Sequence, residues 1–204
     1  MRVRNLFSIG VAVALMIVLR TPVQAQAGKA TIDKLVQVFT HWSGSPKDTS
    51  AYVEASRYID YTGMAQRSLT PAEWNKLSAE QKAQLAKTLR ALIEQRYYTR
   101  WHKIFNKGKV IYESETASGG DTVVKTQLNV GKKVDQLEWR LDNGGTKVVS
   151  LSIGEADLLK KLSARLQGRL NKYGFDGLLT WLKGKANIGP SQEYEEASTN
   201  NSAH

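Results

Sequence analysis

An amphipathic segment, residues 78–105, constrains the fold more than any other part of the sequence. Its large apolar side chains recur at steps of three and four residues, which places them on one face of a helix. They are Leu85, Leu89, Leu92, Ile93, Tyr97, Trp101 and Ile104. This stripe faces either the protein's own core alone, or the core together with an apolar molecule that the protein carries.

Two capping boxes mark where helices begin. Thr70 is followed by Pro71 at the first helical position and by Glu73, and Ser78 is followed by Gln81. In a capping box, the first and fourth residues each use a side chain to satisfy the other's backbone N–H. The spacing predicts a short helix and then the long one.

Helices are also expected near the beginning of the domain. Residues 32–42 have helical spacing, and residues 43–50 have the composition of a loop. Residues 51–69 predict one or two helices, interrupted near Gly63.

After residue 108 the pattern changes from helix to strand. Four segments rich in Val, Ile, Thr, Tyr and Trp are joined by short connections typical of hairpins. They are residues 109–117, 122–130, 134–141 and 147–153. Such a series forms an antiparallel meander, and the alternation of Leu137, Trp139 and Leu141 with polar neighbours predicts one buried face and one wet face.

Helical spacing returns over residues 155–173, with Gly174 as a C-terminal cap and a shorter helix over residues 175–185. The order of helices, strands and helices predicts an α+β fold. We expect a twisted antiparallel sheet of about four strands, packed on one face by helices that enclose an apolar cavity.

Residues 1–27 have the pattern of a secretory signal peptide. Arg2 and Arg4 precede an apolar run that is short for a bilayer span, and Ala25-Gln26-Ala27 supplies the small residues of a cleavage site. We predict cleavage after Ala27 and export. Cleavage after Ala25 and an uncleaved membrane anchor are the alternatives.

The rest of the chain divides into a folded domain, residues 28–188, and a polar, acidic tail, residues 189–204, which we expect to be disordered. There are no cysteines, so the fold must rest on packing without disulfides. Removal of the leader takes away three arginines and no acids, which lowers the net charge from +10 to +7. Basic residues such as Lys160, Lys161 and Arg165 favour encounter with anionic surfaces, or are only solvated.

The sequence lacks the patterns of common enzymes. Its three histidines have no partner at metal-ligand spacing, and there is no nucleophile elbow, P-loop or dinucleotide-binding motif. We therefore expect no catalysis, no metal and no cofactor. The apolar helical stripes either form ordinary core or together line a concave ligand pocket, which would suit a carrier of an anionic amphiphile.

The order of four stretches along the sequence can be compared with known protein families. They are RYIDYTGMAQRSL with the following Trp74, LSAEQKAQLAKTLRALIEQRYY, LEWRLDNGGTKVVSLSI and LNKYGFDGLLTWLKGK. Behind a signal peptide, they resemble the MlaC-type periplasmic phospholipid-binding proteins, the toluene-tolerance auxiliary components of an ABC transport system. The resemblance spans residues 32–185. It departs at Ser150, where the family usually has Asp, and at Leu162-Ser163, where the family has a Tyr-Arg pair.

The resemblance implies a periplasmic, non-enzymatic carrier that binds phospholipid acyl chains and shuttles lipid between an inner-membrane ABC transport complex and an outer-membrane complex. We expect a monomer with no nucleic-acid partner. The candidate lipid-binding residues are Met64, Leu69, Trp74, Leu85, Leu89, Leu92, Ile93, Tyr97, Leu137, Trp139, Leu141, Leu158, Leu162 and Leu166. Which of them line the cavity rather than the core stays open. The alternative function is an envelope binding module for an anionic partner or polyanion.

Overall fold

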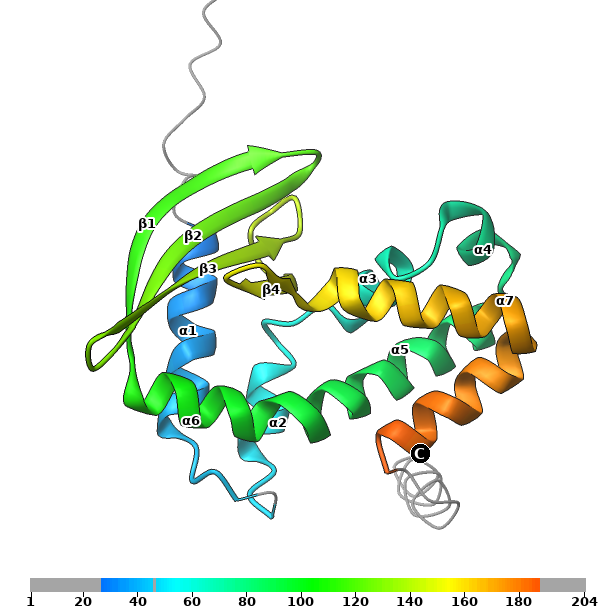
Figure 1. Cartoon of the computed structure of the whole chain (residues 1–204), viewed down its shortest axis with the longest axis horizontal. Helices are drawn as coiled ribbons and strands as arrows, with labels where there is room; N and C mark the ends of the chain where they lie inside the picture. The colour runs from blue at the N-terminus through cyan, green and yellow to red at the C-terminus, as the bar shows by residue number, and fades with distance from the viewer. Residues whose placement is uncertain (1–26, 46, 188–204) are drawn as a thin grey trace, which may run out of the picture.

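A curved antiparallel sheet stands at one end of the molecule, and helices α5 and α7 extend away from it (Figure 1). The computed structural model describes residues 27–45 and 47–187. The helices are α1 (Ala27–His41), α2 (Ser50–Ala55), α3 (Tyr61–Arg67), α4 (Pro71–Lys76), α5 (Ala79–Ile93), the π-helical η2 (Glu94–Tyr98), α6 (Thr99–Lys107) and α7 (Leu158–Lys185). The strands are β1 (Lys109–Ser118), β2 (Asp121–Val130), β3 (Lys133–Leu141), β4 (Val148–Ile153) and β5 (Ala156–Asp157).

The predicted leader, apart from Ala27, and the predicted tail, residues 189–204, lie outside the described residues. Within the described ranges, no helix combines the length and the apolar character needed to cross a bilayer.

The sheet confirms the predicted α+β fold and the predicted meander. All neighbouring strands are antiparallel, in the order β1-β2-β3-β4-β5. Trp139 lies opposite Val124 on the buried face and donates its indole N–H to the Thr126 hydroxyl at 2.9 Å. Phe105 of α6 stacks on Trp139 with ring centroids 5.8 Å apart. One face of the sheet is therefore buried against helices, and it forms one wall of the core.

A fifth strand and a later helix start correct the prediction for the segment after the fourth strand. We predicted a helix from Glu155, but α7 begins at Leu158. Gly154, at φ +57°, turns the chain so that β5 pairs with β4. The Asp157 carboxylate then accepts a hydrogen bond from the Lys160 backbone N–H at 2.9 Å, which caps the helix.

The prediction of a break near Gly63 was wrong about the position, because Gly63 lies inside α3. The break falls between α2 and α3, where the chain pairs with β4. Val148 donates its N–H to the Tyr58 carbonyl at 2.7 Å and accepts from the Asp60 N–H at 2.9 Å. The Asp60 carboxylate then caps α3 by accepting from the Gly63 N–H at 2.8 Å.

Helix α1 begins at Ala27, five residues before the predicted start at residue 32. The reason lies far away in the sequence. Glu115 of β1 accepts hydrogen bonds from the backbone N–H groups of Gly28 and Lys29, at 3.1 and 3.0 Å. A carboxylate at this end satisfies donors that the first helical turn leaves unpaired.

The other predicted helix boundaries agree with the structure. Both capping boxes are present, Thr70 with Glu73 at α4 and Ser78 with Gln81 at α5. Gly174, at φ +68°, interrupts α7 where a C-terminal cap was predicted.

The long predicted helix is continuous, but η2 in its middle is a π-helix. A π turn holds one residue more than an α turn. The most deeply buried side of the run therefore steps by five residues, from Ile93 to Tyr98, and continues to Phe105. The predicted stripe kept steps of three and four and reached Tyr97 and Ile104, which are only half-buried.

Deletion of Gln95, an exposed residue of η2, is expected to convert this π turn into an α turn. The steps from Ile93 through Tyr98 and Trp101 to Phe105 then become four, three and four residues, so these side chains stay on the buried side of the helix. The unfolding free energy in urea should change by no more than about 1 kcal/mol. Deletion of the exposed Ala83 in α5 is the matched control, because it rotates the flanking segments by about 100° and should abolish cooperative unfolding. Equal losses in the two variants would contradict this account.

A buried tyrosine pair joins α3 to η2. The hydroxyl groups of Tyr61 and Tyr98 are hydrogen-bonded to each other, and both side chains are buried. The Arg90 guanidinium lies 5.6 Å from the centre of the Tyr61 ring. Burial raises the pKa of both tyrosines, because the phenolate would lose its hydration.

This pair predicts a loss of stability at alkaline pH. Because the folded pKa values lie above the unfolded value of about 10, the contribution of the two tyrosines to the unfolding free energy is complete below pH 10 and is lost as the pH rises. The unfolding free energy should fall by up to about 1.4 kcal/mol per tyrosine for each pH unit. Urea unfolding between pH 8 and pH 11 should show a smaller slope for the Tyr61→Phe/Tyr98→Phe double variant. Tyr173→Phe, at an exposed position, is the control, and an unchanged slope in the double variant would refute the assignment.

Candidate functional site: a groove between the sheet and two helices

Most of the predicted lipid-binding residues lie in the core. Those that are buried are Met64, Leu69, Leu85, Leu89, Leu92, Ile93, Leu137, Trp139, Leu141 and Leu166. Those that are half-buried and packed against the core are Trp74, Tyr97, Leu158 and Leu162. The partly exposed members are therefore the ones already placed to meet a ligand.

Two of those half-buried residues, Tyr97 and Leu158, meet in a groove of about 230 Å³. We call it the α7 groove, and its lining residues are Tyr97, Arg100, Trp101, Leu151, Ile153, Ala156, Leu158 and Lys161. They come from η2, α6, β4, β5 and the first turn of α7. Its lining residues come from the junction where β4 leads through β5 into α7, and from η2 and α6.

Aromatic packing positions the helical wall of the α7 groove. Tyr97 and Trp101 lie with ring centroids 5.9 Å apart, and Trp101 meets Phe39 of α1 edge-on at 5.4 Å. Because η2 adds a residue, Tyr98 points into the core, where it is buried, and Tyr97 borders the groove. The π turn thus divides two adjacent tyrosines between core and site.

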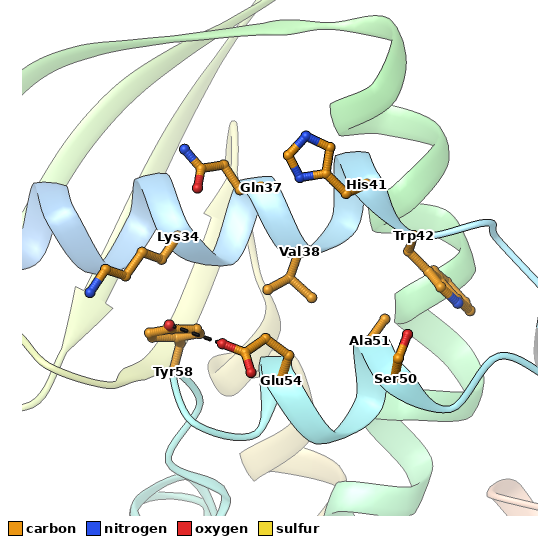
Figure 2. Close-up of a pocket in the computed structure, with 9 residues that line it drawn as sticks. All are labelled: Lys34, Gln37, Val38, His41, Trp42, Ser50, Ala51, Glu54 and Tyr58. Carbon is orange, nitrogen blue, oxygen red and sulfur yellow. Dashed lines mark hydrogen bonds between the residues drawn. The ribbon is translucent and has the colours of Figure 1, made fainter.

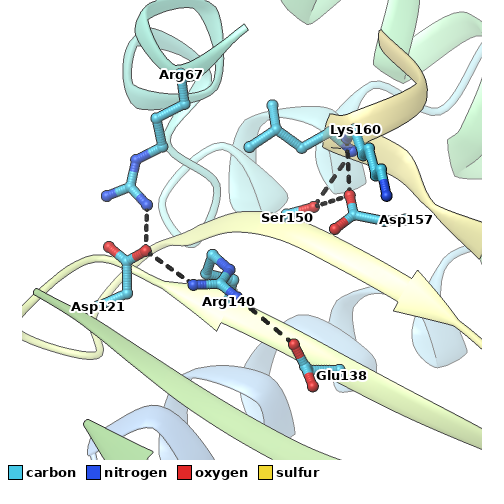
Figure 3. Close-up of polar contacts among 8 residues, drawn as sticks. Arg67, Asp121, Glu138, Arg140, Ser150, Asp157 and Lys160 are labelled. Carbon is cyan, nitrogen blue, oxygen red and sulfur yellow. Dashed lines mark hydrogen bonds and ion pairs between the residues drawn. The ribbon is translucent and has the colours of Figure 1, made fainter. Parts of the chain in front are cut away.

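Polar contacts fix the opposite wall to the sheet (Figure 3). The Ser150 hydroxyl of β4 donates to the Asp157 carboxylate at 3.1 Å and accepts from the Leu159 N–H at 3.3 Å. These bonds tie the start of α7 to β4, and they set the position of Leu158 between them. Ser150 is the position where the resemblance puts an Asp, and here Asp157 brings a carboxylate to the same place.

Further along, α7 is held to the end of α3. The Ser163 hydroxyl and the Gln167 side-chain amide both donate to the Ser68 carbonyl, at 3.0 and 3.3 Å. At its far end, the Arg96 guanidinium donates to the Lys185 carbonyl at 3.0 Å. Hydrogen bonds outside the groove therefore hold α7 along much of its length.

The charged residues of the mainly apolar α7 groove are both basic. Its lining contains Arg100 and Lys161 and no carboxylate. Both side chains are exposed, and neither forms an ion pair or hydrogen bond with any residue in the described ranges. By contrast, Arg67 is paired with Asp121 at 2.6 Å, a contact that Arg140 of β3 also makes (Figure 3).

Sequence reasoning missed most of the lining of this groove. Six lining residues were not among the candidates: Arg100, Trp101, Leu151, Ile153, Ala156 and Lys161. Arg100 follows Tyr97 by three residues and so lies on the same helical face. This spacing was the signal in the sequence that could have identified it. Lys161 looked like one of several surface charges, and only its place beside β4 distinguishes it.

A second, shallower groove of about 500 Å³ lies between α1 and α2 (Figure 2). Its lining residues are Lys34, Gln37, Val38, His41, Trp42, Ser50, Ala51, Glu54 and Tyr58. Tyr58 donates its hydroxyl to Glu54 at 3.2 Å. This carboxylate and the many polar groups make the α1–α2 groove less suited to apolar chains. Within residues 27–45 and 47–187, no three His, Asp or Glu side chains are grouped as a metal site would need.

Comparisons with known proteins agree with the resemblance seen in the sequence. The solved structure of the phospholipid-binding protein from Ralstonia solanacearum, in complex with a phospholipid, superposes with a TM-score of 0.65. The two proteins are 19% identical, and the match covers 80% of this chain and 97% of that one. No curated protein sequence matches significantly. The family model described as MlaC protein matches residues 26–184. The chain therefore belongs to the MlaC family.

Proposed function

We propose that this protein binds the acyl chains of a phospholipid in the α7 groove and carries the lipid between membranes of the cell envelope. The observation that carries the proposal is an apolar groove at the junction of β4, α6 and α7, bordered by Tyr97 and Leu158. Membership of the MlaC family and the phospholipid in the Ralstonia structure support it.

The size of the groove implies that it must widen. Ligand pockets are usually about 300–1,000 Å³, whereas this groove holds about 230 Å³. Acyl chains therefore enter only when α7 moves away from the α5–α6 run. Leu162 and Leu166 lie on α7, which packs against α5, so this movement would turn them from packed surface into groove wall. The widened groove would then include these two further members of the predicted lipid-binding set.

Aromatic contacts that involve no α7 residue would support the sheet during such a movement. Phe39, Phe105 and Trp139 pack together between α1, α6 and β3, in the same core cluster that α7 joins through Leu166. Since the chain has no cysteines, only packing and hydrogen bonds need to change.

The cellular role extends this proposal. The signal-peptide pattern supports a periplasmic location, and the family supports a non-enzymatic shuttle between an inner-membrane ABC complex and an outer-membrane complex. An anionic envelope partner is the second candidate, which the net charge of +7 after removal of the leader favours. The two differ in whether the purified protein carries lipid.

The protein purified under mild conditions is expected to carry phospholipid, measured by mass spectrometry. Leu158→Asp and Ile153→Asp place a charge in the groove and should lower the bound lipid at least about tenfold, because an unpaired charge beside acyl chains is costly. The matched control, Val134→Asp, is at an exposed position of β3 and should keep its lipid.

Leu89→Asp distinguishes core from groove. Leu89 is fully buried and lines neither groove described above, so this variant should unfold. Circular dichroism should show that the two groove variants remain folded. Folded groove variants with full lipid occupancy would rule out this site.

A further inference from the structure

We propose that the α7 groove selects phospholipids whose head group carries net negative charge, and that Arg100 and Lys161 make this selection. This rests on the proposed function, since it assigns a head-group class to the same site. The two side chains stand on the rim of an apolar groove, one on α6 and one on α7.

The first argument is that both charges are available. Arg100 and Lys161 make no ion pair or hydrogen bond with the described residues. Glu94 is engaged by Arg90 at 2.7 Å, and Asp157 accepts from the Ser150 hydroxyl and the Lys160 backbone N–H. These two carboxylates are therefore occupied in holding η2 and the start of α7.

The second argument is that the groove separates charge from apolar surface. Leu151, Ile153 and Leu158 line it together with the two aromatic rings, while both cations are exposed to solvent. An acyl chain against the apolar lining would leave its phosphate at the rim. Arginine binds a phosphate through two parallel N–H groups, and lysine adds a point charge from the other side.

The third argument concerns discrimination between head groups. A zwitterionic head group brings an ammonium beside two cations, which offsets part of the attraction of its phosphate. A net-negative head group has no such cost. It also relieves the repulsion between Arg100 and Lys161 as α7 approaches α6, so it favours closure of the groove over the bound lipid.

The α1–α2 groove does not meet these conditions. It also holds a lysine, Lys34, but Glu54 contributes a carboxylate to the same lining. An anionic head group would meet repulsion there as well as attraction. The charge argument therefore favours the α7 groove.

The test is competition between two lipids that differ only in the head group. The purified protein is incubated with vesicles containing equal amounts of dioleoyl phosphatidylglycerol and dioleoyl phosphatidylethanolamine, and both bound lipids are then counted by mass spectrometry. We expect at least about a tenfold excess of phosphatidylglycerol, the effect of one to two charge-assisted contacts. Arg100→Gln and Lys161→Gln should each lower this ratio severalfold, because less phosphatidylglycerol is bound.

Matched control variants distinguish an effect of the two rim residues from an effect of the overall charge. Lys160→Gln changes the neighbouring lysine, and Arg165→Gln changes an exposed arginine on the same helix; neither side chain lines the groove. Both should keep the native ratio. Lys161→Glu should lower the ratio further than Lys161→Gln.

The outcomes distinguish this proposal from the one it rests on. Equal binding of the two lipids by the native protein would overturn the selectivity and leave lipid binding intact. Equal effects of the rim variants and their controls would overturn the assignment to Arg100 and Lys161. Absence of any bound lipid would overturn the proposed function itself.

Discussion

One helical run has to pack against two different parts of the molecule, and the rest of the structure depends on how it does so. Its first half, α5, packs against α3 and α7, whereas its last part, α6, packs against α1 and β2. A single α-helical stripe does not satisfy both sets of partners. The extra residue in η2 keeps Tyr98 and Phe105 buried in phase with Ile93. It also leaves Tyr97 at the surface, where the groove forms.

Strand β4 is the second fixed point, because it is held at both ends. At its start, Val148 exchanges backbone hydrogen bonds with Tyr58 and Asp60, which positions α3. At its end, β5 and the Asp157 cap position α7. Strand β4 therefore positions both α3 and α7. Its residues Leu151 and Ile153 line the α7 groove.

This arrangement places the candidate groove beside the core. The aromatic packing of Phe39, Phe105 and Trp139 does not involve α7. Contacts of α7 with α3 rely on hydrogen bonds from Ser163 and Gln167 to a single carbonyl, that of Ser68. Under the proposed function, apolar surface along α7 would be exchanged between protein and lipid, while the aromatic contacts between α1, α6 and β3 persist.

Local signals in the sequence were sufficient for most of the fold. The capping boxes at Thr70 and Ser78 placed two helix starts, and alternation placed the first four strands, since both patterns depend on neighbouring residues. The four stretches in order predicted the family, which the comparison confirms. Periodicity could also say which side chains avoid water. It could not say whether protein or lipid covers them, because both are apolar.

Tertiary contacts decided the remaining features. The break before α3 depends on Val148, and the early start of α1 depends on Glu115; both partners are distant in the sequence. The late start of α7 depends on the pairing of β5 with β4. The π turn was invisible to a 3.6-residue period, and it determines that Tyr97 rather than Tyr98 borders the groove. Arg100 and Lys161 are 61 positions apart and become neighbours only when α6 and α7 meet β4. The sequence by itself therefore determined the elements and the apolar surface, whereas the site was decided by folding, because its charge and shape come from residues that only long-range packing brings together.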